Sequence, residues 1–243
     1  MTDLILDIGN SRTKAAVFNG AQLLALRAFA NEDLLGFQGF IDTFAVQRAA
    51  LGSVAGDGNA LVAGLRKQDV PIIELTAQSP APIRSAYSTM PTLGVDRWAN
   101  AAAAAALFPG RAALAIDLGT CITYDLVDSA GIYRGGAISP GGRMRSRAMH
   151  AYSARLPLIE PKPAVPPFGD STAASLQAGL AHGVIGELEH FIGAARASHA
   201  NLGVVLAGGD ALPLARALKS GIFAHPFLTH EGLRIILHHG LGV

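Results

Sequence analysis

The sequence has little cysteine, few charged residues and few aromatic ones, and each shortage excludes a class of protein. A single cysteine, Cys121, excludes an intrachain disulfide and a cysteine-rich zinc site, and it suits a reducing compartment. Charged residues make up 15% of the chain and the formal net charge is +1, so there is no overall attraction to nucleic acid or to an anionic membrane. We therefore expect neither nucleic acid nor a membrane among the partners.

Long apolar runs and a secretory leader are also lacking, although the mean hydropathy is +0.35. The longest alanine-rich run, 98–108, ends at Pro109-Gly110, well short of the roughly 18–20 apolar residues that a spanning helix needs. The first residues carry Asp3 and Asp7 and no basic segment, which does not fit a secretory signal. No G-x-x-x-x-G-K-[ST] motif occurs, which excludes a P-loop. We expect a cytoplasmic protein with a sizeable core, because half of its 243 residues are hydrophobic.

An acidic turn follows the first apolar segment and returns 110 residues later. The stretch LILDIGNSRTKAAVF aligns with LAIDLGTCITYDLVD, and both predict two strands joined by an Asp-x-Gly turn. The matched pairs are Leu4 and Leu114, Asp7 and Asp117, Gly9 and Gly119, Thr13 and Thr123, and Val17 and Val127. The repeat predicts two α/β domains, residues 1–112 and 113–243, each a mixed sheet with helices outside.

The remaining pattern supports this plan. We expect further strands at 22–29, 49–54, 71–75, 132–137 and 202–209. Helices are expected at 31–40, 59–67, 96–107, from 143, across 171–199 and at 211–219, and an extended loop at 78–91.

The two Asp-Gly turns suit magnesium–nucleotide chemistry if the two halves face each other across one cleft. Magnesium prefers one or two carboxylates together with substrate phosphates, and glycine lets backbone N–H groups approach those phosphates. The alternative is an ordinary turn, since Asp, Gly, Asn and Ser are the usual turn residues.

Several other motifs have a structural and a functional interpretation. In TLGVDRW, Asp96 is either the N-cap of the following alanine-rich helix or a catalytic group that orients a substrate hydroxyl. In GGAISPGGRMRSR, the arginines 143, 145 and 147 form a solvated face or, with the helix start, bind an anion. Thr172 is expected as a helix cap by default, and VVLAGGDALPLARAL is either structural or a site for a base or ribose. His238-His239 lie near the end of the chain without further metal ligands in the sequence around them.

Taken together, the motifs resemble the acetate and sugar kinase, actin and heat-shock chaperone superfamily, and most closely the type III pantothenate kinases, the Bvg accessory factor family. The resemblance covers nearly the whole chain, in order: DIGNSRTK, a tyrosine followed by LGVDR, DLGTCIT, GGAISPGG, LP, ST before AG, and AGGDA. It implies an α/β fold of two duplicated actin-like (ribonuclease H-like) domains. It also implies a homodimeric kinase that transfers the γ-phosphate of ATP to pantothenate, the first step of coenzyme A synthesis, with Mg²⁺ and a monovalent cation, K⁺ or NH₄⁺.

The resemblance also implies roles for individual positions. The segment that contacts the ATP phosphates is Asp7, Ile8, Gly9, Asn10, Ser11, Arg12, Thr13 and Lys14, and Thr120 is a further ATP contact. Pantothenate binding falls on Tyr87, Gly94, Val95, Asp96, Arg97 and Thr172, with Asp96 as the proton acceptor; Asp117 is the ligand of the monovalent cation. Two departures are slight, Ser11 for the commoner threonine and Cys121 where alanine is frequent. The alternative is a catalytically silent nucleotide-binding regulatory protein, but neither Asp96 nor the phosphate segment is lost.

Overall fold

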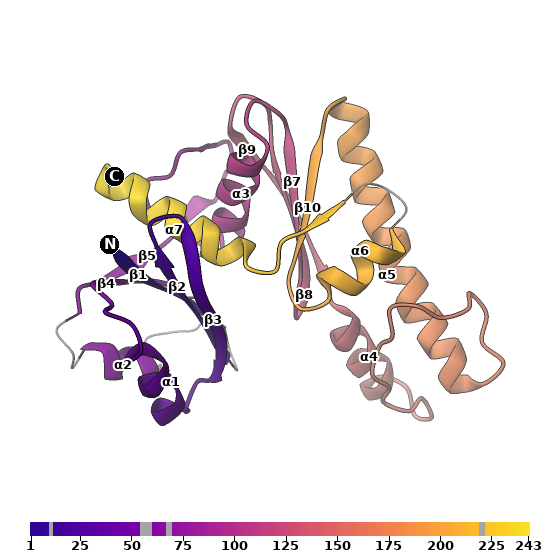
Figure 1. Cartoon of the computed structure of the whole chain (residues 1–243). Coiled ribbons are helices and arrows are strands. Elements are labelled where there is room, and N and C mark those ends of the chain that lie inside the picture. Colours follow the sequence, from indigo (N-terminus) through magenta and orange to yellow (C-terminus); the bar gives the residue numbers. More distant parts are fainter. Residues whose placement is uncertain (10–11, 54–59, 67–69, 219–221) are drawn as a thin grey trace. The chain divides into compact units, whose positions relative to one another are not determined.

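The computed structural model divides the chain into two compact units (Figure 1). Unit 1 holds Met1–Ala103 and Leu228–Val243, and unit 2 holds Ala104–Phe227. The structure describes residues 1–9, 12–53, 60–66, 70–218 and 222–243. The expected boundary after residue 112 differs from this division in two ways. The structure divides the chain inside the alanine-rich helix, and it returns the last residues to the first unit.

Unit 1 contains a mixed five-stranded sheet with the order β3-β2-β1-β4-β5. Strands β1, β2 and β3 form an antiparallel meander, whereas β4 and β5 run parallel to β1. The elements are β1 (Thr2–Ile8), β2 (Arg12–Asn19), β3 (Gln22–Ala30), α1 (Leu34–Ile41), β4 (Arg48–Ser53), α2 (Ala60–Arg66), β5 (Ile72–Leu75), β6 (Arg84–Ser85), the 3-10 turn η1 (Met90–Thr92), α3 (Val95–Leu107) and α7 (Leu228–Leu241).

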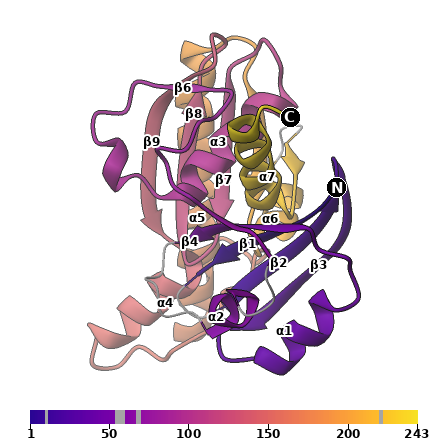
Figure 2. The same ribbon diagram turned by 90° about the vertical axis from the view of Figure 1, so that its left-hand side faces the viewer.

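Helices cover both faces of this sheet, as Figure 2 shows, with α1 and α2 on one side and α7 on the other. The even residues of β1, Leu4, Leu6 and Ile8, are buried in one core with Phe37 of α1 and Leu65 of α2. The odd residues point to α7, because successive side chains of a strand alternate between the two faces. A central strand covered on both faces is apolar along most of its length, which is why the run LILDI is interrupted only by Asp7.

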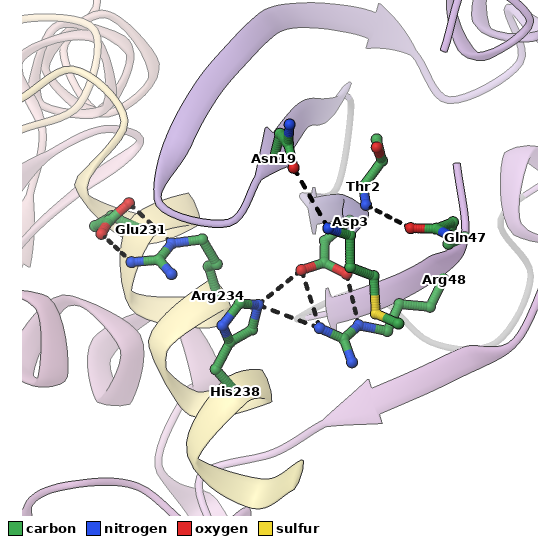
Figure 3. A network of polar contacts seen from close by, with 9 residues as sticks. Thr2, Asp3, Asn19, Gln47, Arg48, Glu231, Arg234 and His238 are labelled. Carbon is green, nitrogen blue, oxygen red and sulfur yellow. Dashed lines mark hydrogen bonds and ion pairs between the residues drawn. The ribbon is translucent and has the colours of Figure 1, made fainter. Parts of the chain in front are cut away.

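A buried ion cluster fastens α7 to the sheet (Figure 3). Asp3 on β1 is fully buried, and its carboxylate accepts hydrogen bonds from Arg48 Nε at 2.5 Å and from His238 Nε2 at 2.7 Å. Burial by itself would raise the pKa of Asp3, but the hydrogen bonds and charges of Arg48 and His238 outweigh it, so the pKa is lowered. His238 is therefore a structural anchor of the last helix.

Helix α3 owes its continuity to alanine, the residue with the highest helix propensity. Its alanines at 99 and 101–104 are completely buried. Against it, α7 presents Gly232, where an added Cβ would collide with the Ala99 carbonyl, and Thr229 donates to Asn100 Oδ1 at 2.9 Å. The two helices thus meet at backbone distance, which only small residues allow.

Unit 2 repeats the architecture of unit 1. The order of its own strands is β11-β10-β7-β8-β9, with β7, β8 and β9 antiparallel and β10 and β11 parallel to β7. The even residues of β7, Leu114, Ile116 and Leu118, are packed with α5 and α6. The elements are β7 (Ala113–Leu118), β8 (Cys121–Val127), β9 (Ile132–Pro140), α4 (Gly142–Ala151), α5 (Thr172–Ser198), β10 (Gly203–Ala207), α6 (Ala211–Ala217) and β11 (Phe223–Ala224). The predicted fold class, duplicated mixed sheets flanked by helices, is confirmed.

The two copies differ by one residue in the first turn, which corrects the sequence alignment. Three residues separate β1 from β2, and two separate β7 from β8. Asp7 therefore pairs with Lys14, whereas Asp117 pairs with Thr123. The counterpart of Thr123 is thus Lys14, and the match between Thr13 and Thr123 is wrong.

Most expected elements lie within a few residues of the observed ones, with two larger differences. The helices expected across 171–199 are one continuous helix, α5, of 27 residues. The final helix α7 was not expected at all, and its apolar residues Leu228, Leu233, Ile236 and Leu237 are buried. Across the described residues, every helix is too short or too polar to cross a membrane.

Candidate active site

The first half of the candidate site is the β1–β2 turn of unit 1. Asp7 lies near the carboxyl end of β1, opposite Lys14 on β2, and the Lys14 Nζ is 3.9 Å from Asp7 Oδ2. The Lys14 side chain is 50% exposed and that of Asp7 is 21% exposed, so both remain accessible to a ligand. Gly9 closes the turn by donating its N–H to the Arg12 carbonyl at 3.0 Å. Asn10 and Ser11 lie outside the described residues.

Two residues that the sequence analysis missed hold this hairpin in place. The Asn31 amide donates to the Gly9 carbonyl at 3.0 Å and accepts from the buried Thr13 hydroxyl at 2.8 Å. From α7, His230 Nε2 lies 3.2 Å from the Lys14 carbonyl, a distance at which the neutral ring donates a hydrogen bond. Burial lowers the pKa of His230 to about 4, so the ring is uncharged at neutral pH. Asn31 directly follows Ala30, which pairs with Arg12 at the start of β2. A sequence prediction of the β2–β3 pairing would therefore have placed Asn31 beside the first turn.

A second group of predicted residues gathers at the start of α3. The Trp98 N–H donates to the Gly94 carbonyl at 3.2 Å, which makes Gly94 the N-cap and places Asp96 two residues inside the helix. The N-cap alternative for Asp96 is therefore wrong. A Cβ at Gly94 would collide with the Asp96 carboxylate, so a side chain at this position would displace that carboxylate.

Next to Asp96, the side chains of Arg97 and Tyr87 come together. The Arg97 guanidinium carbon lies 6.0 Å from the centre of the Tyr87 ring, within the range of a cation–π contact. Arg97 is only 6% exposed, and Val95 is buried as well, so a ligand would reach Val95 only through its backbone.

In unit 2, the second hairpin places Asp117 beside a glycine turn. Gly208 follows β10 with a φ of +89°, and a Cβ there would lie 2.5 Å from both Asp117 Oδ1 and the Leu118 carbonyl oxygen. A carboxylate and a carbonyl oxygen therefore converge on one small region. Carboxylate and carbonyl oxygens are the donor types that hard cations take. Among the described residues there is no group of three or more His, Cys, Asp or Glu side chains arranged as a metal site.

Thr120 lies in the turn after Asp117, exposed to solvent, and its carbonyl accepts from the Gly141 N–H at 3.0 Å. A pocket adjoins this contact, with an apolar floor and a charged rim. Its floor includes Leu118, Ile122, Leu180, Val184 and Leu214, and its rim includes Arg143, Glu160, Lys162 and Asp210. The strand–Gly-Gly–helix segment, for which a base or ribose site was one of two interpretations, contributes Asp210 and Leu214 to this pocket.

Thr172 also belongs to unit 2, where it is exposed and lines an open cavity of about 520 Å³ together with Met149, Leu156 and Asp170. The helix cap is Ser171, whose hydroxyl accepts from the Ala174 N–H at 3.3 Å. The expectation that Thr172 caps the helix is therefore wrong.

Comparison with known proteins decides the family. The family model described as type III pantothenate kinase matches residues 3–194. A type III pantothenate kinase of Bacteroides fragilis is 38% identical over 240 residues, which cover 99% of each chain. The chain belongs to the type III pantothenate kinase family. Another type III pantothenate kinase, from Christiangramia forsetii, is 38% identical over 237 residues and 97% of each chain.

Solved structures agree with the fold of this family. A Baf family protein of Campylobacter jejuni, described as a transcriptional activator, superposes with a TM-score of 0.62 at 20% identity, covering 99% of this chain and all of the other. An N-acetylglucosamine kinase of Porphyromonas gingivalis superposes with a TM-score of 0.51 at 13% identity and 99% coverage of both chains. At such identities the structural likeness shows the fold alone. The names of the full-length relatives favour the kinase over the regulatory alternative.

The three arginines of this type III pantothenate kinase family member have three different environments. Arg143 forms an ion pair with Glu160 at the pocket rim, and Arg147 is exposed. Arg145 turns inward, donating from Nε to the Pro140 carbonyl at 2.7 Å and from Nη2 to Glu187. The sequence alternatives, a solvated face or an anion site, do not describe Arg145.

Proposed function

We propose that this chain transfers the γ-phosphate of ATP to the primary hydroxyl of pantothenate, giving 4'-phosphopantothenate. The observation that carries the proposal is the duplicated hairpin. In both copies an aspartate stands at the same place near the carboxyl end of the central strand, followed two residues later by glycine. Full-length relatives named type III pantothenate kinases support this substrate assignment.

In this proposal the β1–β2 hairpin binds the triphosphate and its Mg²⁺. Asp7 would hold the magnesium ion, because Mg²⁺ takes one or two carboxylates and completes its shell with phosphate oxygens. Lys14 would neutralise phosphate charge, and the segment from Asp7 to Lys14 would supply backbone donors. Thr120 and the neighbouring pocket of unit 2 would bind the rest of the nucleotide.

Asp96 would accept the proton of the attacking hydroxyl. It lies in the first turn of α3, with its carboxylate close to Gly94. In a loose phosphoryl-transfer transition state, positioning and charge neutralisation provide most of the catalysis. Arg97, held against Tyr87, would pair with the pantothenate carboxylate, and Thr172 would contribute a further contact.

Asp117 would bind K⁺ or NH₄⁺ with the help of the Leu118 carbonyl. The support is the convergence of these two oxygens beside Gly208. We also propose a cytoplasmic homodimer. The aromatic residues Tyr152 and Phe168, each at least 90% exposed on the connection between α4 and α5, would be available to such an interface. Light scattering on the purified chain tests it, and a monomer at micromolar concentration would contradict it.

The test of the activity is ADP release by the purified chain with ATP, Mg²⁺ and pantothenate, in potassium or in sodium salt. Turnover that requires pantothenate is expected in potassium, and its absence would overturn the proposal. Asp96→Asn is expected to abolish turnover while the pantothenate Kd changes by less than about tenfold, since one hydrogen-bond partner is altered. Unimpaired turnover in this variant would remove Asp96 from the mechanism.

A further inference from the structure

A polar cluster lies behind the β7–β8 hairpin, and the proposed mechanism does not use it. Four elements contribute one side chain each: Tyr124 from β8, Ser139 from β9, Arg145 from α4 and Glu187 from α5. The Glu187 carboxylate accepts from the Tyr124 hydroxyl at 2.7 Å and from the Ser139 hydroxyl on one oxygen, and from Arg145 on the other. Both carboxylate oxygens are thus engaged.

These contacts affect the pKa values of Glu187 and Tyr124. Burial would raise the pKa of Glu187, but the hydrogen bonds from Ser139, Tyr124 and Arg145 outweigh it and lower the pKa. Burial, together with Glu187, raises the pKa of Tyr124 above its usual range. At neutral pH the cluster is therefore a carboxylate with three donors.

One short segment connects the cluster to the turn that contains Thr120. Arg145 Nε donates to the carbonyl of Pro140, the last residue of β9. The next residue, Gly141, is the N-cap of α4 and donates its N–H to the Thr120 carbonyl at 3.0 Å. A Cβ at Gly141 would lie 2.7 Å from that same oxygen, so the approach leaves no space for adjustment. Movement of the Pro140–Gly141 segment therefore moves the Thr120 turn.

Stability alone does not account for this arrangement. Arg145 and Glu187 have side-chain exposures of 22% and 21%, so the pair is mostly buried, and a buried ion pair is weak evidence for stability because desolvation of the two charges offsets their attraction. Their hydrogen bonds are directed to the end of β9 and the first turn of α4. That turn carries N–H groups without helical partners.

We propose that Glu187 and Arg145 are positioning residues that hold the start of α4 against the Thr120 turn and thereby set the affinity for ATP. This inference rests on the proposed function, which assigns the turn to the nucleotide. The Glu187 carboxylate fixes the Arg145 guanidinium, and the guanidinium fixes the Pro140 carbonyl. Most residues assigned to pantothenate lie in unit 1, so the KM for pantothenate is expected to change less than the KM for ATP.

The decisive comparison is between two arginines of the same helix. Arg145→Met removes the contacts of the guanidinium with Pro140, Ser139 and Glu187, whereas Arg147→Met makes the same chemical change at an exposed position. With Arg145→Met, the KM for ATP is expected to rise at least about fivefold, the factor expected for the loss of one charged hydrogen-bonded pair. The KM for pantothenate is expected to stay within about twofold of the parent value. Arg147→Met is expected to match the parent chain in both.

Two further variants separate positioning from a general loss of structure. Arg145→Lys keeps the charge and one hydrogen bond, so it should recover part of the ATP affinity. Tyr124→Phe removes one donor from Glu187 but leaves the Arg145 contact, so it should lower the melting temperature slightly and leave the KM for ATP within about twofold. The inference is overturned if Arg145→Met leaves the KM for ATP unchanged, if it raises both KM values equally, or if Tyr124→Phe raises the KM for ATP as much.

Calorimetric titration with ATP and Mg²⁺ keeps this test independent of the proposed reaction. If the parent chain binds ATP but does not phosphorylate pantothenate, the proposed function fails, and the ATP Kd of the same variants still decides the role of Arg145. If the parent chain turns over normally and Arg145→Met binds ATP like Arg147→Met, the positioning role fails and the proposed function stands.

Discussion

The two hairpins share one strand arrangement, but their turns differ in length by one residue, and a different side chain therefore stands opposite each aspartate. Both place an aspartate opposite the second strand at the same register. In the longer first turn this opposite residue is Lys14, and in the shorter second turn it is Thr123. A lysine beside Asp7 suits a site for phosphates. The threonine opposite Asp117 places a hydroxyl at the position where the first hairpin has an ammonium group.

The hairpins also differ in what supports them. The first is fixed by side chains from distant segments, Asn31 and His230, which bind its carbonyl groups. The second is fixed by a backbone contact, from Gly141 to Thr120, with Arg145 behind it. The comparison teaches that a duplicated strand order does not preserve the surroundings of the duplicated residues.

Removing the charge of each aspartate is expected to have the largest effect and to show most clearly whether the two hairpins differ in role. Asp7→Asn is expected to reduce kcat/KM by about 100-fold or more in any salt, the size of effect seen when one group that stabilises developing charge is removed from a prearranged site. Asp117→Asn should instead abolish the difference between potassium and sodium. Initial rates against KCl concentration measure both, and equal responses of the two variants would show that the hairpins share one role.

A methyl group at Gly208 should disturb the cation site next most. Gly208→Ala places a Cβ against Asp117 and the Leu118 carbonyl at a positive φ, which is expected to cost about 1–3 kcal/mol of folding stability and to weaken the potassium response. Gly209→Ala is the matched control, because no atom lies within 4 Å of its added Cβ. Urea unfolding and salt titration measure the pair; a stable Gly208→Ala variant with normal potassium activation would contradict the assignment.

Thr123→Lys should make the second hairpin resemble the first. An ammonium group opposite Asp117 would take the place of the bound cation, so activity without potassium should rise and the response to KCl should flatten. Thr123→Met has a similar length without charge and is expected to leave the potassium dependence in place. A full KCl response in Thr123→Lys would show that charge opposite Asp117 does not distinguish the two turns.

The smallest expected effect concerns acid stability, where the ion clusters of the two units behave alike. The pKa values of Asp3 and Glu187 are both lowered in the folded chain, so their contributions are present above the ordinary carboxylate pKa near 4 and disappear as the pH falls through the lower folded values. Unfolding free energies measured from pH 6 down to pH 3 should decrease, with a shallower decrease in Asp3→Asn. An identical slope in that variant would exclude Asp3 as a source of acid sensitivity.

The sequence predicted the strands and the acidic turns well, because alternation and turn residues are local properties. Gly94 and Asp96 were placed together for the same reason. It did not predict the anchoring of the first hairpin, since Asn31 and Gly9 are 22 residues apart and His230 and Lys14 are 216 apart. The false match of Thr13 with Thr123 arose because identical residues on both sides of a turn conceal a one-residue difference within it. That Asp7 and Asp117 face one cleft stays a prediction.

Alanine-rich α3 has a consequence for how the protein tolerates mutation. Its buried alanines have no side-chain rotamers to lose on folding and pack at backbone distance, so every added carbon atom must displace a neighbour. In a complete substitution scan, the alanines at 99 and 101–104 should tolerate as little change as the acidic turns, with glycine and serine the least harmful replacements. Intolerance in such a scan would therefore mark two different things, reactive groups at the turns and sheer lack of volume along α3.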